Sequence, residues 1–201
     1  MKKVLIVGGV AGGASTAARL RRLDENLEII MFERGEYVSF ANCGLPYHIG
    51  GVIQNRESLL VQTPESLKAR FNLDVRINSE VIEVNGKEKK VRVKTKNGEE
   101  YEENFDFLVL APGAKPILPA IKGIENKKIF TLRNINDMDK IKSEIKNHNI
   151  KKATVVGGGY AGVETAENLK HLGIDTTLIE AAPHILAPFD SEISNILEYE
   201  L

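Results

Sequence analysis

Two glycine-rich windows constrain what this 201-residue chain can fold into more than any other feature. The windows span residues 8–13 and 157–162 and together hold eight of the 17 glycines. Each follows a short apolar run and precedes a helical stretch, after which a second apolar run ends in an acidic residue, Glu33 or Glu180. This order of segments, found twice, predicts an α/β chain with two Rossmann-like βαβ units of about 30 residues each.

The segment between the two units has a different pattern. Three short stretches of alternating character lie at 81–84, 90–96 and 99–103, separated by Asn85-Gly86 and Asn97-Gly98. Both Asn-Gly pairs are strong hairpin-turn signals. We therefore predict an antiparallel β-meander inserted into the first α/β unit.

Further elements are expected on either side of this meander. A strand is predicted at 105–110, and Thr63 and Pro64 predict the start of a short helix, as its cap and its first residue. A longer helix is expected at 135–148. We interpret its many charged side chains as a solvated surface.

The boundary between the two halves is expected in the stretch 112–119, which holds three prolines and one glycine. It divides the chain into one domain at 1–114 and another at 115–201. No low-complexity segment or Pro/Ser-rich linker interrupts either half.

Composition excludes several classes of protein. The 27 basic residues balance 28 acidic ones to a net charge of −1, which argues against a nucleic-acid-binding protein. No apolar run reaches the length of about 20 residues that a membrane helix needs. The single cysteine, Cys43, excludes an intrachain disulfide and fits a reducing, cytoplasmic compartment. The histidines show no metal-ligand spacing, so no metal site is predicted.

The second window has the spacing of a dinucleotide-binding turn. Gly157, Gly159 and Gly162 form a strict G-x-G-x-x-G, and Glu180 follows Gly157 by 23 residues, where a carboxylate can bind ribose hydroxyls. No arginine follows Glu180 closely to bind a ribose 2′-phosphate. We therefore expect this turn to bind NADH in preference to NADPH, without excluding NADPH. His184 is the one nearby residue that can weaken this preference.

The first window is less regular, because Val10 replaces the middle glycine of the pattern while Gly9 and Gly12 add flexibility. Glu33, 25 residues after Gly8, is placed for the ribose role. An ordinary strand–turn–helix is the alternative, and the second copy of the unit weakens it. Two such units predict two different dinucleotides, one that stays bound and one that binds and dissociates.

The lone cysteine lies among polar residues and glycines, just before a short helix-like segment. A sulfur at a helix N-terminus gains thiolate character, and a thiolate beside a flavin can exchange with a disulfide or cycle through a sulfenic acid. The alternative, a buried small hydrophobe, carries similar weight at this point. For His48 we favour a polar lid over a proton shuttle. Tyr160 either covers a cofactor ring or packs locally.

Together these motifs resemble a known family. The chain is similar to the pyridine nucleotide–disulfide oxidoreductases in three features. These are the two glycine units, the sequence Ala111-Pro112-Gly113 at the crossover, and the single cysteine within Ser39-Phe40-Ala41-Asn42-Cys43-Gly44-Leu45-Pro46-Tyr47. Within them the chain resembles the single-cysteine branch, which contains coenzyme A-disulfide reductases, CoA-dependent persulfide reductases, NADH oxidases and NADH peroxidases.

The resemblance implies that 1–114 is an FAD-binding domain and 115–201 an NAD(P)-binding domain. It further implies a cytoplasmic flavoprotein that passes electrons from NADH through FAD to Cys43, the catalytic residue, which holds coenzyme A as a mixed disulfide. Tyr160 is similar to a tyrosine that covers the flavin, and Glu164 to a residue near the nicotinamide. The residues assigned to the cofactors are Gly8, Gly9, Gly12, Gly13, Glu33, Ala111, Gly113, Gly157, Gly159, Tyr160, Gly162, Glu164 and Glu180. Those assigned to coenzyme A are Ser15, Arg19, Arg22, Ser39 and Asn42.

Three departures from the family pattern refine this expectation. Ala11 stands where peroxidases and water-forming oxidases carry a histidine, which favours reduction of a disulfide or persulfide. Phe71 stands where a CoA-contacting lysine is expected, although Arg70 is adjacent. Family members are more than twice as long, and full-length forms are homodimers, so both nucleotide domains are expected to be incomplete. The alternatives are an NADH oxidase and a non-catalytic nucleotide-binding fragment.

Overall fold

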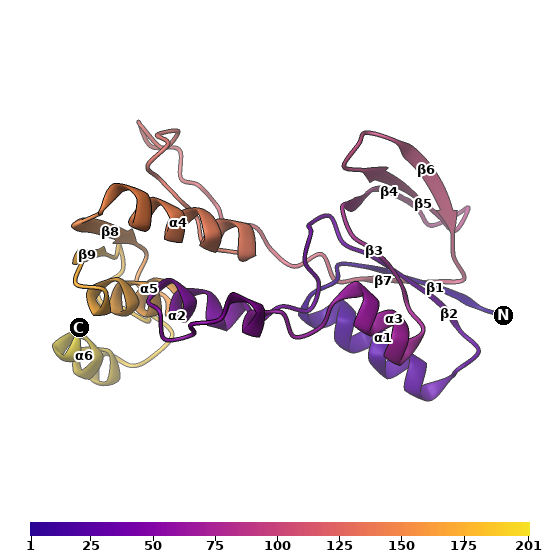
Figure 1. Cartoon of the computed structure of the whole chain (residues 1–201), viewed down its shortest axis with the longest axis horizontal. Coiled ribbons are helices and arrows are strands. Elements are labelled where there is room, and N and C mark those ends of the chain that lie inside the picture. Colours follow the sequence, from indigo (N-terminus) through magenta and orange to yellow (C-terminus); the bar gives the residue numbers. More distant parts are fainter. The chain divides into compact units, whose positions relative to one another are not determined.

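The computed structural model describes residues 1–201, which divide into two compact units (Figure 1). The first contains Met1–Phe40 and Leu60–Lys115, and the second contains Ala41–Leu59 and Pro116–Leu201. The segment around Cys43 therefore belongs to the second unit, although it precedes most of the first in the sequence. Which dinucleotide each half binds stays a prediction.

A four-stranded parallel sheet forms the centre of the first unit, in the order β3-β2-β1-β7. Its strands are β1 (Lys3–Val7), β2 (Glu28–Phe32), β3 (Asp74–Arg76) and β7 (Phe107–Leu110). Helix α1 (Ala11–Leu23) connects β1 to β2, whose register runs from Lys3 opposite Glu28 to Val7 opposite Phe32. The first βαβ unit is thus confirmed. Its strands are almost wholly apolar because both faces of the sheet are covered.

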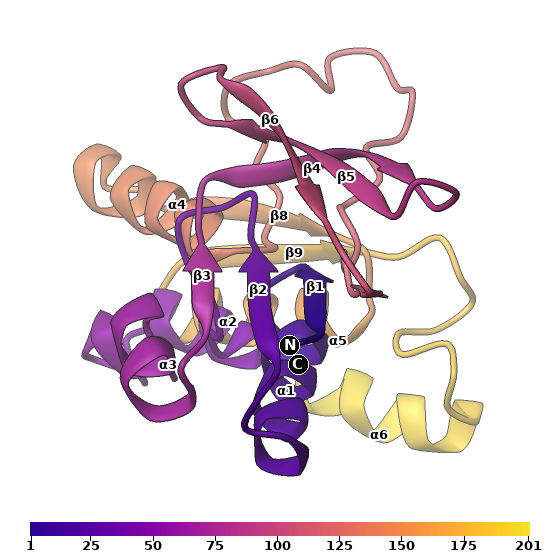
Figure 2. The same cartoon turned by 90° about the vertical axis from the view of Figure 1, so that its right-hand side faces the viewer.

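The two faces of the sheet are covered by different layers (Figure 2). Val4, Ile6 and Met31 pack with α1 and with α3 (Pro64–Phe71) on one face. Leu5 and Phe32 pack on the other face against an antiparallel meander. The meander consists of β4 (Ser79–Asn85), β5 (Lys90–Thr95) and β6 (Glu100–Asn104). The predicted insertion is therefore confirmed, and it supplies a third layer to the unit.

Local signals set the ends of several elements in this unit. Thr63 caps α3 by accepting a hydrogen bond from the backbone N–H of Ser66, as the sequence predicted for a cap followed by proline. Gly98 adopts a positive φ of 88° in the predicted second hairpin turn. In the first turn the loop is longer than an Asn-Gly pair, and Lys89, not Gly86, takes the positive φ.

The second unit contains the other βαβ repeat. Strands β8 (Lys152–Val156) and β9 (Asp175–Ile179) are parallel, and α5 (Tyr160–His171) connects them. Helix α4 (Ile135–His148) has the predicted bounds. The C-terminal helix α6 (Ser191–Glu200) was not predicted, and neither was β3 in the first unit.

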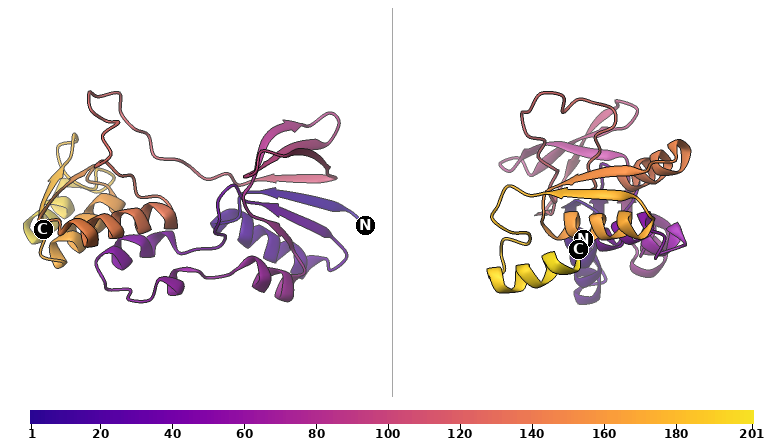
Figure 3. Two further views of the ribbon diagram at one scale, coloured as in Figure 1. Left: turned by 45° about the horizontal axis from the view of Figure 1, so that its top comes forward. Right: turned by 90° about the vertical axis from the view of Figure 1, so that its left-hand side faces the viewer.

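Three short elements carry the cysteine segment, Ala41–Leu59: the 3₁₀ turn η1 (Asn42–Gly44), helix α2 (Leu45–Ile49) and the 3₁₀ turn η2 (Arg56–Leu59). Helix α2 lies beside α4 and α5 within the second unit (Figure 3). No helix in the chain is long and apolar enough to span a bilayer.

Candidate functional site

The two glycine turns have the same backbone geometry. Gly8 and Gly157 both have positive φ, 101° and 107°. A Cβ atom on Gly13 would lie 1.7 Å from the carbonyl oxygen of Gly8, and one on Gly162 would lie 1.8 Å from that of Gly157. In each repeat the last glycine therefore lets the helix pack directly on the turn, which is the role the G-x-G-x-x-G pattern gives it.

The acidic residue at the end of the second strand binds the glycine turn in both repeats. Glu33 accepts hydrogen bonds from the backbone N–H groups of Gly9 at 2.9 Å and Gly35 at 2.8 Å. Glu180 accepts the equivalent bonds from Ala182 at 2.7 Å and Gly158 at 2.5 Å. These backbone bonds lower the pKa of Glu180. Both carboxylates are thus fixed beside the turns, where the sequence placed a ribose-binding group.

The tip of the second turn is open. A Cβ on Gly157 or on Gly159 would have no atom within 4 Å, so another molecule can approach the backbone there. Neither α5 nor α1 has a side chain that caps its first backbone N–H groups. These N–H groups can donate to a pyrophosphate. The residues present therefore fit a dinucleotide at each turn.

The first turn differs from the second because another segment crosses it. A Cβ on Gly8 would lie 2.0 Å from the carbonyl oxygen of Ala111, and the Ala111 N–H donates to the Val7 carbonyl at 2.8 Å. Gly113 follows with a positive φ of 67°. The structure thus brings Ala111, and the turn that Gly113 permits, to the first glycine window.

A pocket of about 480 Å³ lies within the first unit, between α1, α3 and the chain at Ser39. Its polar wall is formed by Ser15, Arg22, Ser39, Gln62 and Arg70, and no acidic side chain lines it. The remaining wall residues are apolar, namely Val10, Ala11, Ala14, Ala18, Phe40, Val61, Leu67 and Phe71. The pocket combines cationic, hydroxyl and apolar surface.

The two guanidinium groups of this pocket are available to an anion. Arg22 and Arg70 are exposed, and neither forms an ion pair with a carboxylate. The Arg70 guanidinium lies 5.1 Å from the centre of the Phe71 ring, which is the cation–π distance. Paired arginine donors match the geometry of phosphate oxygens. A ligand with phosphate groups and a less polar arm fits this arrangement.

The pocket gathers three of the five residues assigned to coenzyme A, Ser15, Arg22 and Ser39. Arg19 is exposed but does not line it. Asn42 belongs to the second unit. The site residues that sequence reasoning did not assign are Gln62 and Arg70. Helical spacing after the Thr63 cap was a usable signal for Arg70, because buried Leu67 sits three residues before it on the same helix face.

The cysteine is exposed and unbridged, in the 3₁₀ turn η1. This exposure contradicts the alternative in which Cys43 is a buried small hydrophobe. Four residues on, the negative charge of Glu164 raises the pKa of Tyr47. Glu164, the residue assigned to the nicotinamide, lies on α5, which packs against the helix that follows Cys43.

Tyr160 and His48 differ in their exposure to solvent. Tyr160 opens α5 and is 60% exposed, with only an edge-on contact to Phe189 at 6.1 Å between ring centres. Its ring face is therefore accessible. His48 is 4% exposed, and both its ring nitrogens lie within hydrogen-bonding distance of protein atoms. That burial fits the interpretation of His48 as a polar lid and not as a proton shuttle. No cluster of three potential metal ligands occurs in the chain.

Comparison with known proteins agrees with this geometry. The family model described as pyridine nucleotide-disulphide oxidoreductase matches residues 2–201. A coenzyme A disulfide reductase of Staphylococcus haemolyticus is 41% identical over the whole chain, which spans 45% of that protein. The reduced CoADR-RHD of Bacillus anthracis is 55% identical with a TM-score of 0.97, covering 99% of this chain and 36% of that one. A NAD-dependent persulfide reductase from A. fulgidus is 36% identical with a TM-score of 0.93, over 99% of this chain and 38% of that one.

Proposed function

Because this chain belongs to the pyridine nucleotide-disulphide oxidoreductase family, whose members use FAD and NAD(P)H, we propose that it is part of a flavin-dependent reductase of CoA disulfide or of a CoA or low-molecular-weight persulfide. The chain spans less than half of the relatives it matches, so this activity is proposed for the whole protein. FAD is assigned to the first glycine turn and NADH to the second.

The pocket of the first unit carries this proposal. Coenzyme A is a nucleotide with several phosphates and a long, weakly polar pantetheine arm. Arg22 and Arg70 offer unpaired guanidinium groups to the phosphates, and the alanines of α1 offer apolar surface to the arm. Ser39 and Phe40 form part of the wall, and Cys43 follows Phe40 by three residues in the sequence.

The proposed reaction assigns the sulfur chemistry to Cys43. Its thiolate attacks one sulfur of CoA disulfide, which forms a Cys43–CoA disulfide and releases one CoA thiolate. FAD, when bound, supplies the two electrons that originate from NADH. These electrons break the mixed disulfide, releasing the second CoA and restoring the Cys43 thiolate. With a CoA persulfide, the same attack on the CoA-bearing sulfur releases hydrosulfide.

NADH is favoured over NADPH by the residues that follow β9. Glu180 is held by backbone N–H groups in its carboxylate form, and Ala181, Ala182 and Pro183 follow it. A negative charge at this position repels a 2′-phosphate, and no arginine follows Glu180 in the sequence to bind one.

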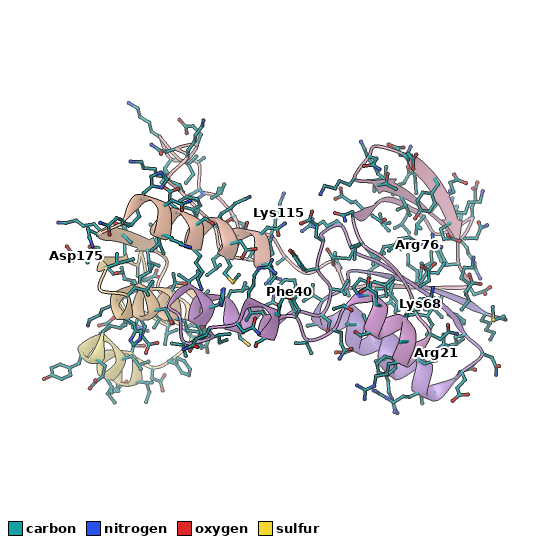
Figure 4. The ribbon with its side chains drawn as sticks, viewed as in Figure 1. Arg21, Phe40, Lys68, Arg76, Lys115 and Asp175 are labelled. Atoms are coloured by element: carbon teal, nitrogen blue, oxygen red, sulfur yellow. The ribbon has the colours of Figure 1, made fainter.

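The pocket is tested by calorimetric titration of the chain with coenzyme A. We expect Arg22→Ala and Arg70→Ala each to weaken binding by about tenfold, since each removes charge-assisted hydrogen bonds. Lys68→Ala is the matched control, because Lys68 is exposed on α3 (Figure 4) and does not line this pocket. Equal affinity of all variants would remove the pocket as the coenzyme A site.

A non-catalytic nucleotide-binding module is the second candidate, because the uncapped N–H groups at both glycine turns fit a dinucleotide by themselves. The visible spectrum separates the two. A flavin band that NADH bleaches after reconstitution with FAD supports catalysis by this chain itself. A chain that binds the nucleotides without bleaching is a binding module.

A further inference from the structure

One face of α4 is not the solvated surface that its charge pattern suggested. Asp139 and Lys142 are three residues apart, so they project from the same side of the helix. Both make contacts with the cysteine segment, Ala41–Leu59. By contrast Lys140, between them in sequence, is exposed and makes no hydrogen bond or ion pair.

Lys142 contacts a single residue of α2 twice. Its ammonium group donates to the backbone carbonyl of His48 at 2.7 Å and lies 3.1 Å from the ring nitrogen Nε2. The other ring nitrogen, Nδ1, lies 2.6 Å from the carbonyl oxygen of Ile53, which can only accept. In the neutral ring that satisfies both partners, Nδ1 carries the proton and Nε2 accepts from Lys142. His48 thus links Lys142 to the loop after α2.

Asp139 makes the second connection. Its carboxylate accepts three hydrogen bonds from the Arg56 guanidinium, at 3.0, 3.1 and 2.8 Å. Arg56 opens η2, near the end of the cysteine segment. Both groups are partly exposed, so this pair is expected to contribute less than the contacts of buried His48.

Helix α2, which Lys142 contacts at His48, is too short to be stable by itself. Helix α2 has five residues, far fewer than an isolated helix needs in water. At its C-terminal end, a Cβ on Gly50 would lie 2.2 Å from the side-chain oxygen of Asn168 on α5. Tertiary contacts of α4 and α5 therefore fix α2, and with it the turn that carries Cys43.

From this arrangement we infer that Lys142 is a positioning residue for Cys43, acting through His48 and α2. The inference deepens the proposed function, because a thiol that must face both a disulfide and an electron donor needs a fixed backbone. Lys142 itself touches neither the sulfur nor any ligand-binding surface described above.

Hydrogen exchange followed by mass spectrometry tests the structural half of this inference without cofactors or substrate. In Lys142→Met, amides in 45–56 should exchange about tenfold faster, because the N–H groups of Gly50, Gly51 and Ile53 lose their fixed acceptors. Peptides from β8, in the same unit as Lys142, report whether the fold of that unit is intact. Lys140→Met is the matched control and should exchange as the parent chain does.

A second readout is the sulfur itself. Cys43 is the sole cysteine, so its rate of alkylation by iodoacetamide as a function of pH reports on this segment alone. We expect a shifted rate profile in Lys142→Met, the parent profile in Lys140→Met, and rescue by Lys142→Arg, which keeps the charge and the donors. If Lys142→Met does not fold, Lys142→Arg and His48→Asn carry the comparison. The inference would be overturned if Lys142→Met, or His48→Asn, showed the same exchange and alkylation rates as the parent chain. This outcome does not depend on whether the chain binds coenzyme A.

Discussion

At the scale of single residues, position decides which of several similar side chains is available for chemistry. Arg21 and Arg22 are neighbours on α1. Arg21 (Figure 4) is buried and donates to the carbonyl groups of Glu25, Phe71 and Asn72, whereas Arg22 lines the pocket. Arg21 uses three of its five N–H donors on these carbonyl oxygens and is buried, so it is not available to a phosphate in the pocket. Only Arg22 of this pair is a ligand-binding candidate.

The first residue-scale prediction concerns Cys43. In the whole protein, Cys43→Ser should abolish turnover of CoA disulfide while NADH still bleaches the flavin, because a hydroxyl cannot form the mixed disulfide. Stopped-flow absorbance separates the two half-reactions. Undiminished turnover would remove Cys43 from the chemistry.

The second concerns the choice of nicotinamide nucleotide. Replacing Glu180 by Ala together with Ala181 by Arg removes the repelling carboxylate and adds a cation for the 2′-phosphate. We expect kcat/KM to move from an NADH preference toward NADPH by about tenfold or more. A parent protein that already prefers NADPH would contradict the role given to Glu180.

At the scale of elements, each glycine turn depends on close contact between a helix and the turn before it. Gly13 and Gly162 lie where an added Cβ would overlap a carbonyl oxygen, whereas Gly159 has open space around it. The sequence pattern treats these glycines alike. Their packing separates a structural requirement from a ligand-binding one.

Gly162→Ala should accordingly destabilise the second unit by about 2 kcal/mol or more, because helix α5 must move away from the turn. Gly159→Ala should leave stability nearly unchanged and weaken NADH binding, since its methyl group occupies the space open to the pyrophosphate. Urea unfolding and a binding titration on both variants measure the two effects. Equal loss of stability in both would contradict this division.

Element bounds followed the sequence where a local signal was strong. The Thr63 cap, the helix at 135–148 and both βαβ units were predicted because propensity, capping and apolar pattern agree there. Strand β3 was missed, since three residues carry too little pattern and the strand depends on pairing with β2. The charged face of α4 was misread because helical spacing alone does not show which side chains meet a partner.

At the scale of the whole molecule, charges far apart in sequence connect the layers of the first unit. Arg76 lies between the parallel sheet and the meander, and its guanidinium donates to Glu103 at 2.8 Å and to the Tyr101 hydroxyl at 3.2 Å (Figure 4). Lys3 donates to the same Glu103 carboxylate at 2.9 Å. Burial opposes ionisation of Glu103, but these two cations outweigh it and the pKa of Glu103 is lowered.

This network predicts a pH dependence of stability. A carboxylate whose pKa is lowered by folding stabilises the native state above its unfolded pKa, and that contribution is lost as pH falls through the folded value. Glu103→Gln should therefore lower the free energy of unfolding by about 1–3 kcal/mol at pH 7 and flatten its decline below about pH 4.5. Urea midpoints across pH measure this. An unchanged slope in Glu103→Gln would show that other carboxylates control acid stability.

The sequence by itself determined the repeated βαβ units, the inserted meander and the family, because glycine spacing, apolar runs and Asn-Gly pairs act through local backbone geometry. Only the tertiary structure decided that Arg70 shares a pocket with Arg22, that Arg19 does not, and that Lys142 supports the helix after Cys43. These contacts join residues between 48 and 94 positions apart. Such pairs depend on how layers pack, because periodicity in the sequence shows which face of an element is buried but not which distant residue that face meets.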